Sequence, residues 1–242
     1  MPEEYLALCQ LIDKRRRARP AGATFVVGIA GGVAVGKTTS ARRLQSLLGG
    51  RVGAGRVERV STDAFLFSNS ELERRRLALR KGFPESYDLA SLQQFLAAVR
   101  AGASDASAPV YDHRVYDVVA GERHAVGHPD VLLLEGCNVL QAGIAVDLGI
   151  YLDAATSDIR CWFVARFIHL ARQAAGDTGS FFAPWSEYGD DQLTTLAESV
   201  WDHINEVNLT QHILPTRERA DVIVRKDAGH RIVDIVEVRC GG

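Results

Sequence analysis

A glycine-rich stretch between an apolar run and a helical pattern constrains this chain more than any other feature. Residues 28–39 read GIAGGVAVGKTT and contain the pattern G-x-x-x-x-G-K-T, which begins at Gly31 and ends at Thr38. Residues 24–30, just before it, are apolar and rich in β-branched side chains, as is typical of a buried parallel strand. Residues 37–48 repeat apolar side chains at helical spacing. A strand, a glycine loop and a helix in this order predict an α/β fold with a phosphate-binding loop.

The loop predicts a site for a nucleoside triphosphate. Its glycines let backbone N–H groups turn toward a phosphate, and the helix N-terminus adds partial positive charge. Lys37 is placed to reach the outer phosphates, and Thr38 to hold Mg²⁺ through its hydroxyl. An incidental glycine turn is the competing interpretation, and the regular flanks argue against it. The nucleotide-binding residues predicted here are Gly31, Val33, Ala34, Val35, Gly36, Lys37, Thr38 and Thr39.

Length and composition are those of a globular protein. The chain has 242 residues, of which 47% are hydrophobic, enough to bury a large core and too many for general disorder. We expect a three-layer α/β fold in which helices flank a mostly parallel central sheet. A single domain is expected over residues 1–242, with residues 1–22 forming an N-terminal helix and linker.

Charge and cysteine usage limit the expected partners and compartment. The net charge of −2 gives no general attraction to nucleic acid or to an anionic membrane, and no apolar run is long enough to span a bilayer. Glu3 and Glu4 precede the first apolar run, an order unlike that of a secretory signal. The four cysteines form no C-x-x-C pair, which is typical of reduced, buried thiols in a cytoplasmic protein. They are Cys9, Cys137, Cys161 and Cys240.

Two carboxylates come at the ends of predicted strands. Asp63 follows the strand predicted over residues 57–61, and Glu135 directly follows the apolar run at residues 131–134. In a parallel sheet such residues lie at the edge where ligands bind. Asp63 is therefore the candidate general base for a substrate hydroxyl, with an N-cap or turn aspartate as the alternative. Glu135 is placed to hold Mg²⁺, because a buried strand that ends in an unpaired glutamate is costly.

A hairpin is predicted in the middle of the chain. Residues 109–119 alternate and include β-branched and aromatic side chains, and we expect the chain to turn at Gly121 and return as a partner strand. If the run is extended, Tyr111, His113 and Val115 share one face. That face either lines a polar substrate pocket or is an exposed face of the hairpin.

The remaining elements are predicted from their periodicity. Helices are expected at residues 70–80 and 191–208, and two adjacent short strands at residues 221–225 and 232–238 close the sheet. Residues 175–190 are irregular and rich in glycine and aromatic side chains, which makes them the best candidate for a mobile lid or substrate loop.

Arg166 falls within the apolar stripe of the helix predicted over residues 157–172, an unusual place for a solvated arginine. It would then need an anion. The transferred phosphoryl group is one candidate, and a buried salt bridge to Glu135 or another carboxylate is the competing explanation.

This order of motifs is typical of a small-molecule kinase with a P-loop kinase fold. A switch GTPase usually carries an N-K-x-D motif that reads the base, and this sequence has none. Phosphoryl transfer needs mainly positioning and charge stabilisation. Lys37, Mg²⁺, Arg166 and the loop amides are expected to supply the charge, and Asp63 to accept the proton.

Several longer motifs carry a family resemblance. The segments STDAFL, RKGFPESYD, APVYDHRVYDV, HPDVLLLEGCNVLQ and ILPTRERA, together with the glycine loop, resemble successive motifs of the bacterial type I pantothenate kinases. That family lies in the P-loop phosphoribulokinase and uridine kinase group. The resemblance implies ATP-dependent phosphorylation of the primary hydroxyl of pantothenate, the first step of coenzyme A biosynthesis. It also implies feedback inhibition by coenzyme A and a homodimer.

The resemblance extends to single positions. It implies that Lys37 and Thr38 bind phosphate and Mg²⁺, that Asp63 is the base, and that Glu135 is the carboxylate on the metal side. It implies a transition-state role for Arg166. Positions matched to the pocket for substrate and inhibitor are Tyr111, His113, Tyr116 and Asn205. Positions matched to the neighbourhood of the nucleotide or coenzyme A are Arg42, Lys226 and His230.

Departures from the family pattern gather on the acceptor side. Phe163 stands where the family usually has a tyrosine whose hydroxyl contacts pantothenate, and Ala175 stands where an aromatic side chain closes over the substrate. Losing a hydroxyl from a polar pocket alters selectivity, because a polar group of the substrate is left unpaired. Two alternatives therefore stay open: a kinase of the same fold for another hydroxyl acceptor, such as a nucleoside or a sugar acid, and a non-catalytic sensor of nucleotide or coenzyme A.

Overall fold

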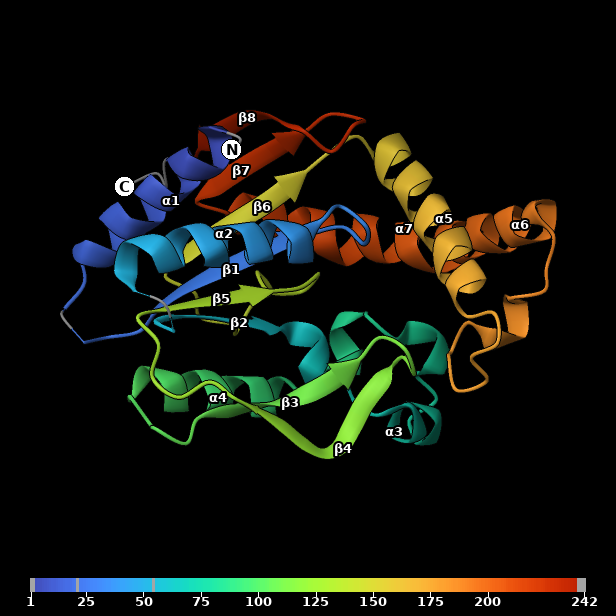
Figure 1. Cartoon of the computed structure of the whole chain (residues 1–242), viewed down its shortest axis with the longest axis horizontal. Coiled ribbons are helices and arrows are strands. Elements are labelled where there is room, and N and C mark those ends of the chain that lie inside the picture. The colour runs from blue at the N-terminus through green and yellow to red at the C-terminus, as the bar shows by residue number, and fades with distance from the viewer. Residues whose placement is uncertain (1–2, 21, 54, 239–242) are drawn as a thin grey trace.

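A computed structural model describes residues 3–20, 22–53 and 55–238 of the chain (Figure 1). Six strands form one sheet in the order β2-β5-β1-β6-β7-β8, and all neighbouring pairs are parallel except β7 with β8. The prediction of a mostly parallel central sheet is confirmed. The six strands are β1 Phe25–Gly31, β2 Val57–Ser61, β5 Val131–Glu135, β6 Leu148–Asp153, β7 Val222–Lys226 and β8 Ile232–Glu237.

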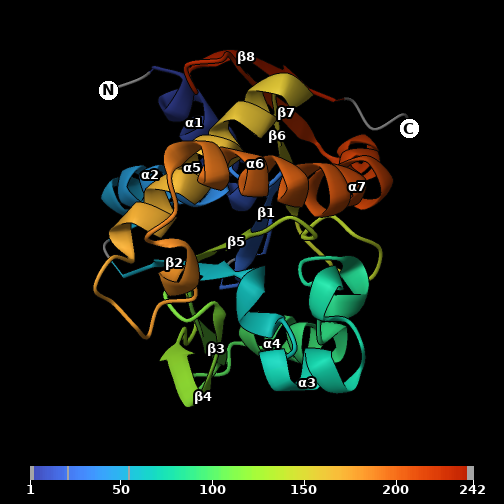
Figure 2. The ribbon, with the colours of Figure 1, turned by 90° about the vertical axis from the view of Figure 1, so that its right-hand side faces the viewer.

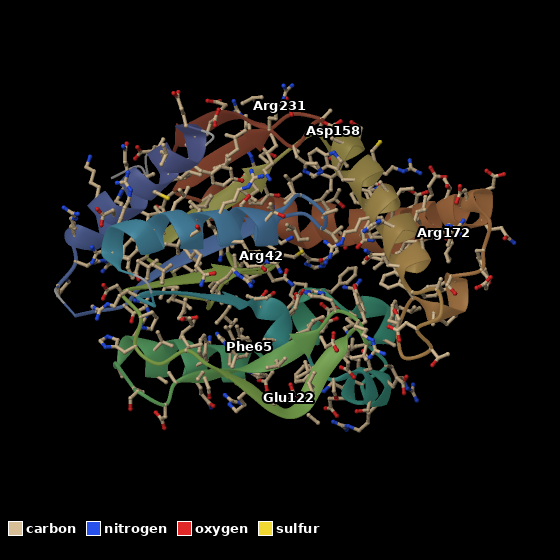
Figure 3. All side chains as sticks on the ribbon, in the orientation of Figure 1. Arg42, Phe65, Glu122, Asp158, Arg172 and Arg231 are labelled. Atoms are coloured by element: carbon tan, nitrogen blue, oxygen red, sulfur yellow. The ribbon has the colours of Figure 1, made fainter. Side chains whose placement is uncertain are left out.

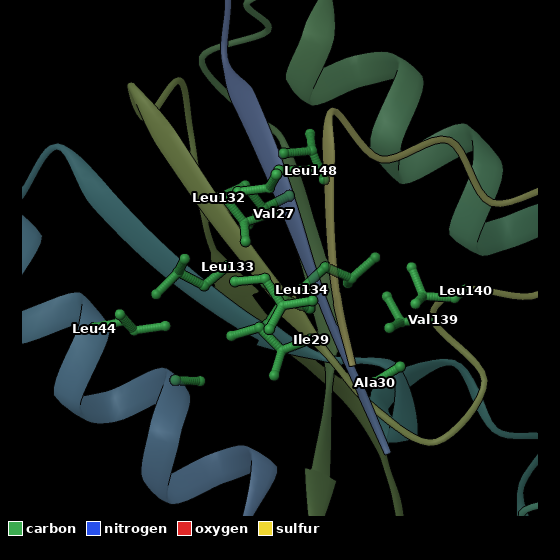
Figure 4. Close-up of a cluster of buried hydrophobic side chains, with 14 of the residues drawn as sticks. Val27, Ile29, Ala30, Leu44, Leu132, Leu133, Leu134, Val139, Leu140 and Leu148 are labelled. Carbon is green, nitrogen blue, oxygen red and sulfur yellow. The ribbon is translucent and has the colours of Figure 1, made fainter. Parts of the chain in front are cut away.

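The core forms on both faces of the central strands. Every residue of β1 and β5 is buried, as expected for strands of a parallel sheet that helices cover on both sides. Figure 4 shows the buried side chains of these strands, with α2 and α4 on opposite sides of them. This is the three-layer arrangement predicted from the sequence. The helices of seven or more residues are α1 Glu3–Arg17, α2 Lys37–Val52, α4 Leu89–Arg100, α5 Thr156–Gln173 and α6 Asp190–Val200.

The last long helical segment is interrupted twice. After α6, the chain passes through a π-helical turn (Trp201–Asn205), the short α7 (Glu206–Asn208) and a second π-helical turn (Leu209–Ile213). The helix predicted over residues 191–208 is therefore confirmed in type and continues further. π-Helical turns inside a helix are rare and often lie at functional sites.

The hairpin turns earlier than predicted. β3 (Ser107–Asp112) and β4 (Asp117–Ala125) form a sheet of their own, so the chain reverses at residues 113–116 and not at Gly121. Tyr116, at the end of this turn, has a φ of 57°. The prediction that Tyr111, His113 and Val115 share a strand face is wrong, because the strand ends before His113. In Figures 1 and 2 the hairpin lies beside α3 (Asn69–Arg74) and α4, below the main sheet.

The helix predicted over residues 70–80 is also wrong in extent. α3 spans only Asn69–Arg74, and a short 3-10 turn follows at Ala78–Arg80. Arg76 adopts a φ of 60°, a left-handed conformation that ends an α-helix. Ser68 caps α3, its hydroxyl accepting a hydrogen bond from the backbone N–H of Glu71 at 3.3 Å.

The burial of the cysteines and the length of the helices can be compared with the environment expected from the sequence. Cys9, Cys137 and Cys161 are free thiols; Cys9 is buried, Cys137 half-buried and Cys161 exposed, so the expectation of buried thiols fails for Cys161. Cys240 lies outside the described residues. Within the described part of the chain, no helix is long and apolar enough to cross a membrane.

Candidate active site

The glycine loop connects the end of β1 to the start of α2. Gly31 has a φ of 142°, and a Cβ atom there would lie 2.7 Å from the carbonyl oxygen of Leu152, so this position accepts only glycine. Gly36, just before α2, has a φ of 91°. The backbone thus takes the turn that the sequence pattern predicts, and α2 begins at Lys37 with its N-terminus at the loop.

Lys37 lies against the loop itself. Its Nζ donates to the carbonyl oxygens of Gly31 at 3.0 Å and Gly32 at 2.7 Å, and it lies 3.3 Å from Sγ of Cys137. These contacts hold the ammonium group at the mouth of the loop. A phosphate bound by the loop amides would meet this positive charge.

Thr38 and Glu135 meet beside the loop. The Thr38 hydroxyl donates to Oε1 of Glu135 at 2.9 Å, and Nη1 of Arg59 lies 3.7 Å from the same oxygen. Glu135 is only 3% exposed, and burial raises the pKa of its carboxyl group while the charge of Lys37 opposes the rise. Burial of this kind favours a cation close to the carboxylate.

The donor set fits Mg²⁺. A hydroxyl and a carboxylate are the hard oxygen ligands that this ion prefers, and it usually takes few protein ligands together with phosphate oxygens. Among the described residues, no group of three or more His, Cys, Asp or Glu side chains could hold a metal ion by itself, without further ligands such as phosphate oxygens. Thr38 and Glu135 are therefore the residues that would hold Mg²⁺ next to a bound phosphate.

Asp63 lies at the same edge of the sheet as Glu135. It sits on a short 3-10 turn, Thr62–Phe65, directly after β2, and β2 pairs with β5 so that Ser61 is opposite Glu135. Ser61 caps this turn by accepting a hydrogen bond from the Asp63 backbone N–H, so the alternative that Asp63 itself is the cap is wrong. Its carboxylate instead accepts a hydrogen bond from the Tyr87 hydroxyl at 3.3 Å.

A groove of ≈ 1160 Å³ runs along the loop and the start of α2. Arg43 lines it and Arg42 does not; Figure 3 labels Arg42 on α2, and also Arg231, which lines the groove just before β8. The predicted site residues that line the groove come from three parts of the chain. They are Ala34, Gly36, Lys37, Thr38, Thr39, Arg166, Lys226 and His230.

Lys226 and His230 come to the loop from the end of β7. Lys226 is 7% exposed, and its Nζ donates to the carbonyl oxygen of Val35 at 2.9 Å. Burial lowers the pKa of Lys226 to about 8. The His230 ring stacks on Trp162 of α5, with 3.7 Å between ring centroids, and Trp162 Nε1 donates to the carbonyl oxygen of Ala228 at 3.0 Å. The sequence does not reveal this contact, because nothing in the spacing of Trp162 along its helix points to a partner as distant in the chain as His230.

Arg166 is exposed and faces the groove. The prediction that it is buried within the apolar stripe of its helix is wrong, because the buried positions of α5 are Ile159, Phe167 and Ala171. The ion-pair partner of Glu135 is Arg59, which removes the competing explanation of an Arg166–Glu135 salt bridge. An exposed arginine beside the phosphate loop is free to meet an anion.

Aromatic rings of the hairpin form a wall near Asp63. The Tyr111 ring lies 5.0 Å from His113 and 6.0 Å from Tyr116, centroid to centroid, both edge to face. Burial raises the pKa of Tyr111, and the negative charge of Asp63 adds to the rise, so this ring lies within the field of that carboxylate. Lys81, which sequence reasoning did not single out, donates to the carbonyl oxygen of Tyr116, and its Nζ lies 4.8 Å from the Tyr116 ring centroid.

The predicted lid lies against the hairpin turn. Arg114 makes two hydrogen bonds to the carboxylate of Asp177, at 2.7 and 2.6 Å, and the backbone N–H of Phe181 donates to the Arg114 carbonyl oxygen at 2.8 Å. The Phe181 ring stacks on Tyr116 at 4.6 Å. Residues 175–190 thus cover one side of the aromatic wall.

Phe163 and Asn205, the remaining predicted substrate residues, lie on α5 and on the first π-helical turn. Phe163, on α5, packs between the rings of Phe167 at 6.2 Å and Trp201 at 5.9 Å. Asn205 is half-buried at the end of the first π-helical turn. The structure thus brings Lys37, Thr38, Glu135 and Asp63 to one edge of the sheet, with the aromatic rings of the hairpin near Asp63.

Comparison with known proteins places this geometry in a family. Residues 26–166 match the model of the phosphoribulokinase/uridine kinase family. A pantothenate kinase of Mycolicibacterium vanbaalenii is 49% identical over 214 residues, which cover 86% of this chain and 69% of that protein. A pantothenate kinase of Mycobacteroides abscessus is 43% identical over 252 residues, covering 95% of this chain and 81% of the other.

Solved structures agree on the fold. D-glycerate 3-kinase from Cryptococcus neoformans superposes with a TM-score of 0.67 at 14% identity, covering 97% of this chain and 99% of that one. A provisionally assigned fructose transport system kinase from Silicibacter sp. gives a TM-score of 0.67 at 22% identity, covering 89% of this chain and 94% of the other. With the phosphate loop, the strand-end carboxylates and the aromatic hairpin in one site, the chain belongs to the phosphoribulokinase/uridine kinase family and, within it, to the bacterial pantothenate kinases.

Proposed function

We propose that this protein transfers the γ-phosphate of ATP to the primary hydroxyl of pantothenate, the first step of coenzyme A biosynthesis. One structural observation supports the proposal in addition to family membership. Asp63 lies at the sheet edge shared with Glu135, and its charge acts on the tyrosines of the hairpin. This position supports the proposed role of Asp63 as the proton acceptor between a phosphate site and a wall for an alcohol.

The proposed roles follow from charge and position. The loop amides and Lys37 bind the phosphates, and Arg166 meets the charge that develops on the transferred group. Mg²⁺, held by Thr38 and Glu135, would neutralise phosphate charge. Asp63 orients the acceptor hydroxyl for attack and accepts its proton.

The acceptor would be enclosed by two surface segments. Tyr111, His113 and Tyr116 form one wall, with Phe163 and Asn205 opposite. We infer that residues 175–190 act as the lid of a single domain that spans residues 1–242, because this segment already contacts the hairpin turn. Closing the lid would exclude water from the transferred phosphoryl group.

The proposals on regulation, assembly and compartment rest on family membership and composition. Coenzyme A is the expected inhibitor, and the basic side chains of the groove, Arg43, Lys226 and Arg231, suit its phosphates. A homodimer is expected from the family. The three described cysteines are free thiols, which suits the reducing cytoplasm. Neither nucleic acid nor a membrane is expected as a partner.

An acceptor panel tests the proposal. Purified protein is incubated with ATP and Mg²⁺ and, in separate reactions, with pantothenate, nucleosides and sugar acids, and ADP release is followed. We expect acceptor-dependent ADP release with pantothenate and a phosphorylated product of matching mass. Release of ADP only with another acceptor would reject pantothenate as the substrate.

A kinase for a different alcohol is the second candidate function, and Phe163 favours it. This side chain has no hydroxyl to offer and packs on Phe167 and Trp201, so the pocket is more apolar here than the family pattern implies. The same panel decides between the two kinases. Turnover with any acceptor also excludes a non-catalytic sensor of nucleotide or coenzyme A.

A further inference from the structure

The segment Lys81–Asp88 has no role in the function proposed above, yet it is tightly organised. Gly82 has a φ of 89°, its backbone N–H donates to Oγ of Ser86 at 2.9 Å, and the same hydroxyl donates to the carbonyl oxygen of Phe83 at 2.7 Å. Ser86 is fully buried. These bonds close the segment on itself and fix its shape.

The C-terminal end of this segment is hydrogen-bonded to the residues that follow Asp63. The backbone N–H of Phe67 donates to the carbonyl oxygen of Ser86 at 2.9 Å, and that of Asp88 donates to the carbonyl oxygen of Phe65 at 2.7 Å. Between these two bonds lies Tyr87, which is 9% exposed. Its hydroxyl reaches Oδ1 of Asp63 at 3.3 Å. This is long for an O–H···O bond, as is common for catalytic contacts before substrate binds.

The N-terminal end of the segment is held by two buried asparagines. The carbonyl oxygen of Gly82 accepts hydrogen bonds from Nδ2 of Asn138 at 2.9 Å and from Nδ2 of Asn208 at 2.8 Å. Asn138 is 4% exposed and Asn208 7%. Asn138 follows β5 and Glu135, whereas Asn208 lies between the two π-helical turns, close to Asn205. The carbonyl oxygen of Gly82 therefore links the segment after β5, which carries Glu135, to the helical segment that carries Asn205.

The side-chain oxygens of these asparagines are unused. Oδ1 of Asn138 and Oδ1 of Asn208 are buried, and neither has a hydrogen-bond partner among the described residues. Burying an unpaired amide oxygen is costly. Two buried side chains that direct their amide donors to one backbone oxygen are placed to fix the position of that oxygen, and the side chain of Asn138 also hydrogen-bonds Tyr87 directly.

We propose that Tyr87 is a positioning residue for Asp63, and that Asn138 and Asn208 hold Tyr87 in place through the carbonyl oxygen of Gly82. The proposal rests on the function assigned to Asp63 above. A hydroxyl that donates to Oδ1 fixes the rotation of the carboxylate, so that Oδ2 faces the acceptor hydroxyl and takes its proton. Burial and the negative charge of Asp63 raise the pKa of Tyr87 well above its usual value, so the hydroxyl remains a donor.

Replacing Tyr87 by phenylalanine tests the hydroxyl and keeps the ring. With the acceptor found in the panel, Tyr87→Phe is expected to lower kcat about tenfold, because the base is less well oriented. The KM and Kd of ATP should stay within about twofold of wild type, since the phosphate loop is untouched. Tyr151→Phe is the matched control; it removes a buried hydroxyl on β6 near Asp153 and Arg217, and kcat should be retained.

A double-mutant cycle tests the link through Gly82. Asn208→Ala alone should lower kcat about threefold, and Tyr87→Phe combined with Asn208→Ala should be no slower than Tyr87→Phe alone, because both act through one hydroxyl. Losses that multiply would overturn the link. If Asn208→Ala does not fold, as a thermal unfolding curve would show, Asn208→Ser takes its place, because it also removes the amide donor to the Gly82 carbonyl oxygen and keeps a polar side chain.

The outcomes separate this proposal from the function on which it rests. A wild-type enzyme that is active while Tyr87→Phe keeps its full kcat overturns only the role of Tyr87. A Tyr87→Phe enzyme whose KM for ATP rises also overturns the role of Tyr87. An equal loss of kcat in Tyr151→Phe does the same, because a general loss of structure would produce either result. A wild-type protein that turns over no acceptor overturns the proposed function first, and the role of Tyr87 with it.

Discussion

The phosphate side and the acceptor side of the site are built in different ways. On the phosphate side, Glu135 ends the fully buried strand β5, and Lys37 and Thr38 begin α2, which follows the fully buried strand β1 and the glycine loop. On the acceptor side, a separate hairpin and an irregular segment meet through aromatic rings, the Arg114–Asp177 ion pair and a backbone hydrogen bond from Phe181 to Arg114. The first arrangement is fixed by the core of the protein, and the second by contacts between surface segments.

This difference bears on how each side tolerates change. A parallel sheet buried on both faces loses stability when its residues are altered, so its geometry is strongly constrained. An exposed ion pair contributes about 0–1 kcal/mol, and an aromatic pair adds about 1 kcal/mol beyond its buried area. We therefore expect the chemistry of phosphoryl transfer to be rigidly specified and the choice of acceptor to be adjustable.

Removing the carboxylate at the junction of the two sides should have the largest effect. Asp63→Ala is expected to lower kcat by about 10³, because the acceptor hydroxyl loses its base and its orientation. ATP affinity, measured by titration calorimetry, should stay within about twofold, since Asp63 does not belong to the phosphate loop. A comparable loss of ATP affinity would contradict the separation of the two sides. Asp63→Asn is the control variant, because it removes the negative charge and keeps the volume of the side chain.

A change of pH should act on the phosphate side alone. The pKa of Lys226 is lowered to about 8, so its ammonium group is charged at pH 7 and loses its proton as the pH rises through about 8. ATP binding should therefore weaken about tenfold between pH 7 and pH 9, since the charge that faces the phosphates is lost.

Two lysine variants check the origin of that pH dependence. In Lys226→Met the affinity for ATP should vary little over the same range. Lys14→Met, which alters an exposed lysine of α1, should behave as wild type. A pH dependence that persists in Lys226→Met would point to another group.

Restoring a hydroxyl to the acceptor wall should have a moderate effect. Phe163→Tyr is expected to lower the KM for pantothenate about fivefold, because one hydrogen bond contributes about 1 kcal/mol when its partner is otherwise unpaired. The KM for ATP should not change. If KM for pantothenate rises and another acceptor from the panel improves, the pocket is adapted to a different alcohol.

Breaking the contact between hairpin and lid should have the smallest effect. Arg114→Ala removes both hydrogen bonds to Asp177, and the KM for the acceptor should rise about twofold, as expected for an exposed ion pair. Arg123→Ala on β4, whose side chain bonds Ser107 within the hairpin, is the control and should leave KM unchanged. An effect as large as that of Phe163→Tyr would mean that this contact sets the acceptor pocket.

The sequence predicted the structure well wherever the residues of one short stretch determine its conformation. β1, β5 and the glycine loop were predicted closely, because apolar runs and glycines at positive φ leave a local pattern. The same holds for the placement of Asp63 and Glu135 at one edge, which follows from the parallel sheet.

Prediction failed where distant residues decide the local structure. Nothing near Trp162 indicates that it stacks on His230, and nothing near Lys81 indicates that it donates to the carbonyl oxygen of Tyr116. The helix expected at residues 70–80 ends early because Arg76 takes a left-handed conformation, which its side chain does not favour. These features depend on tertiary contacts that override local propensity.

The independence of the hairpin has a consequence for how such an enzyme diverges. β3 and β4 pair with each other and not with the six-stranded sheet. An exchange of this ribbon between related enzymes would therefore leave the strand register of the scaffold intact, and the phosphotransfer residues would keep their places. New acceptors are accessible to this architecture by grafting, provided that the new ribbon keeps a small side chain at Ala108, which is buried in the main core.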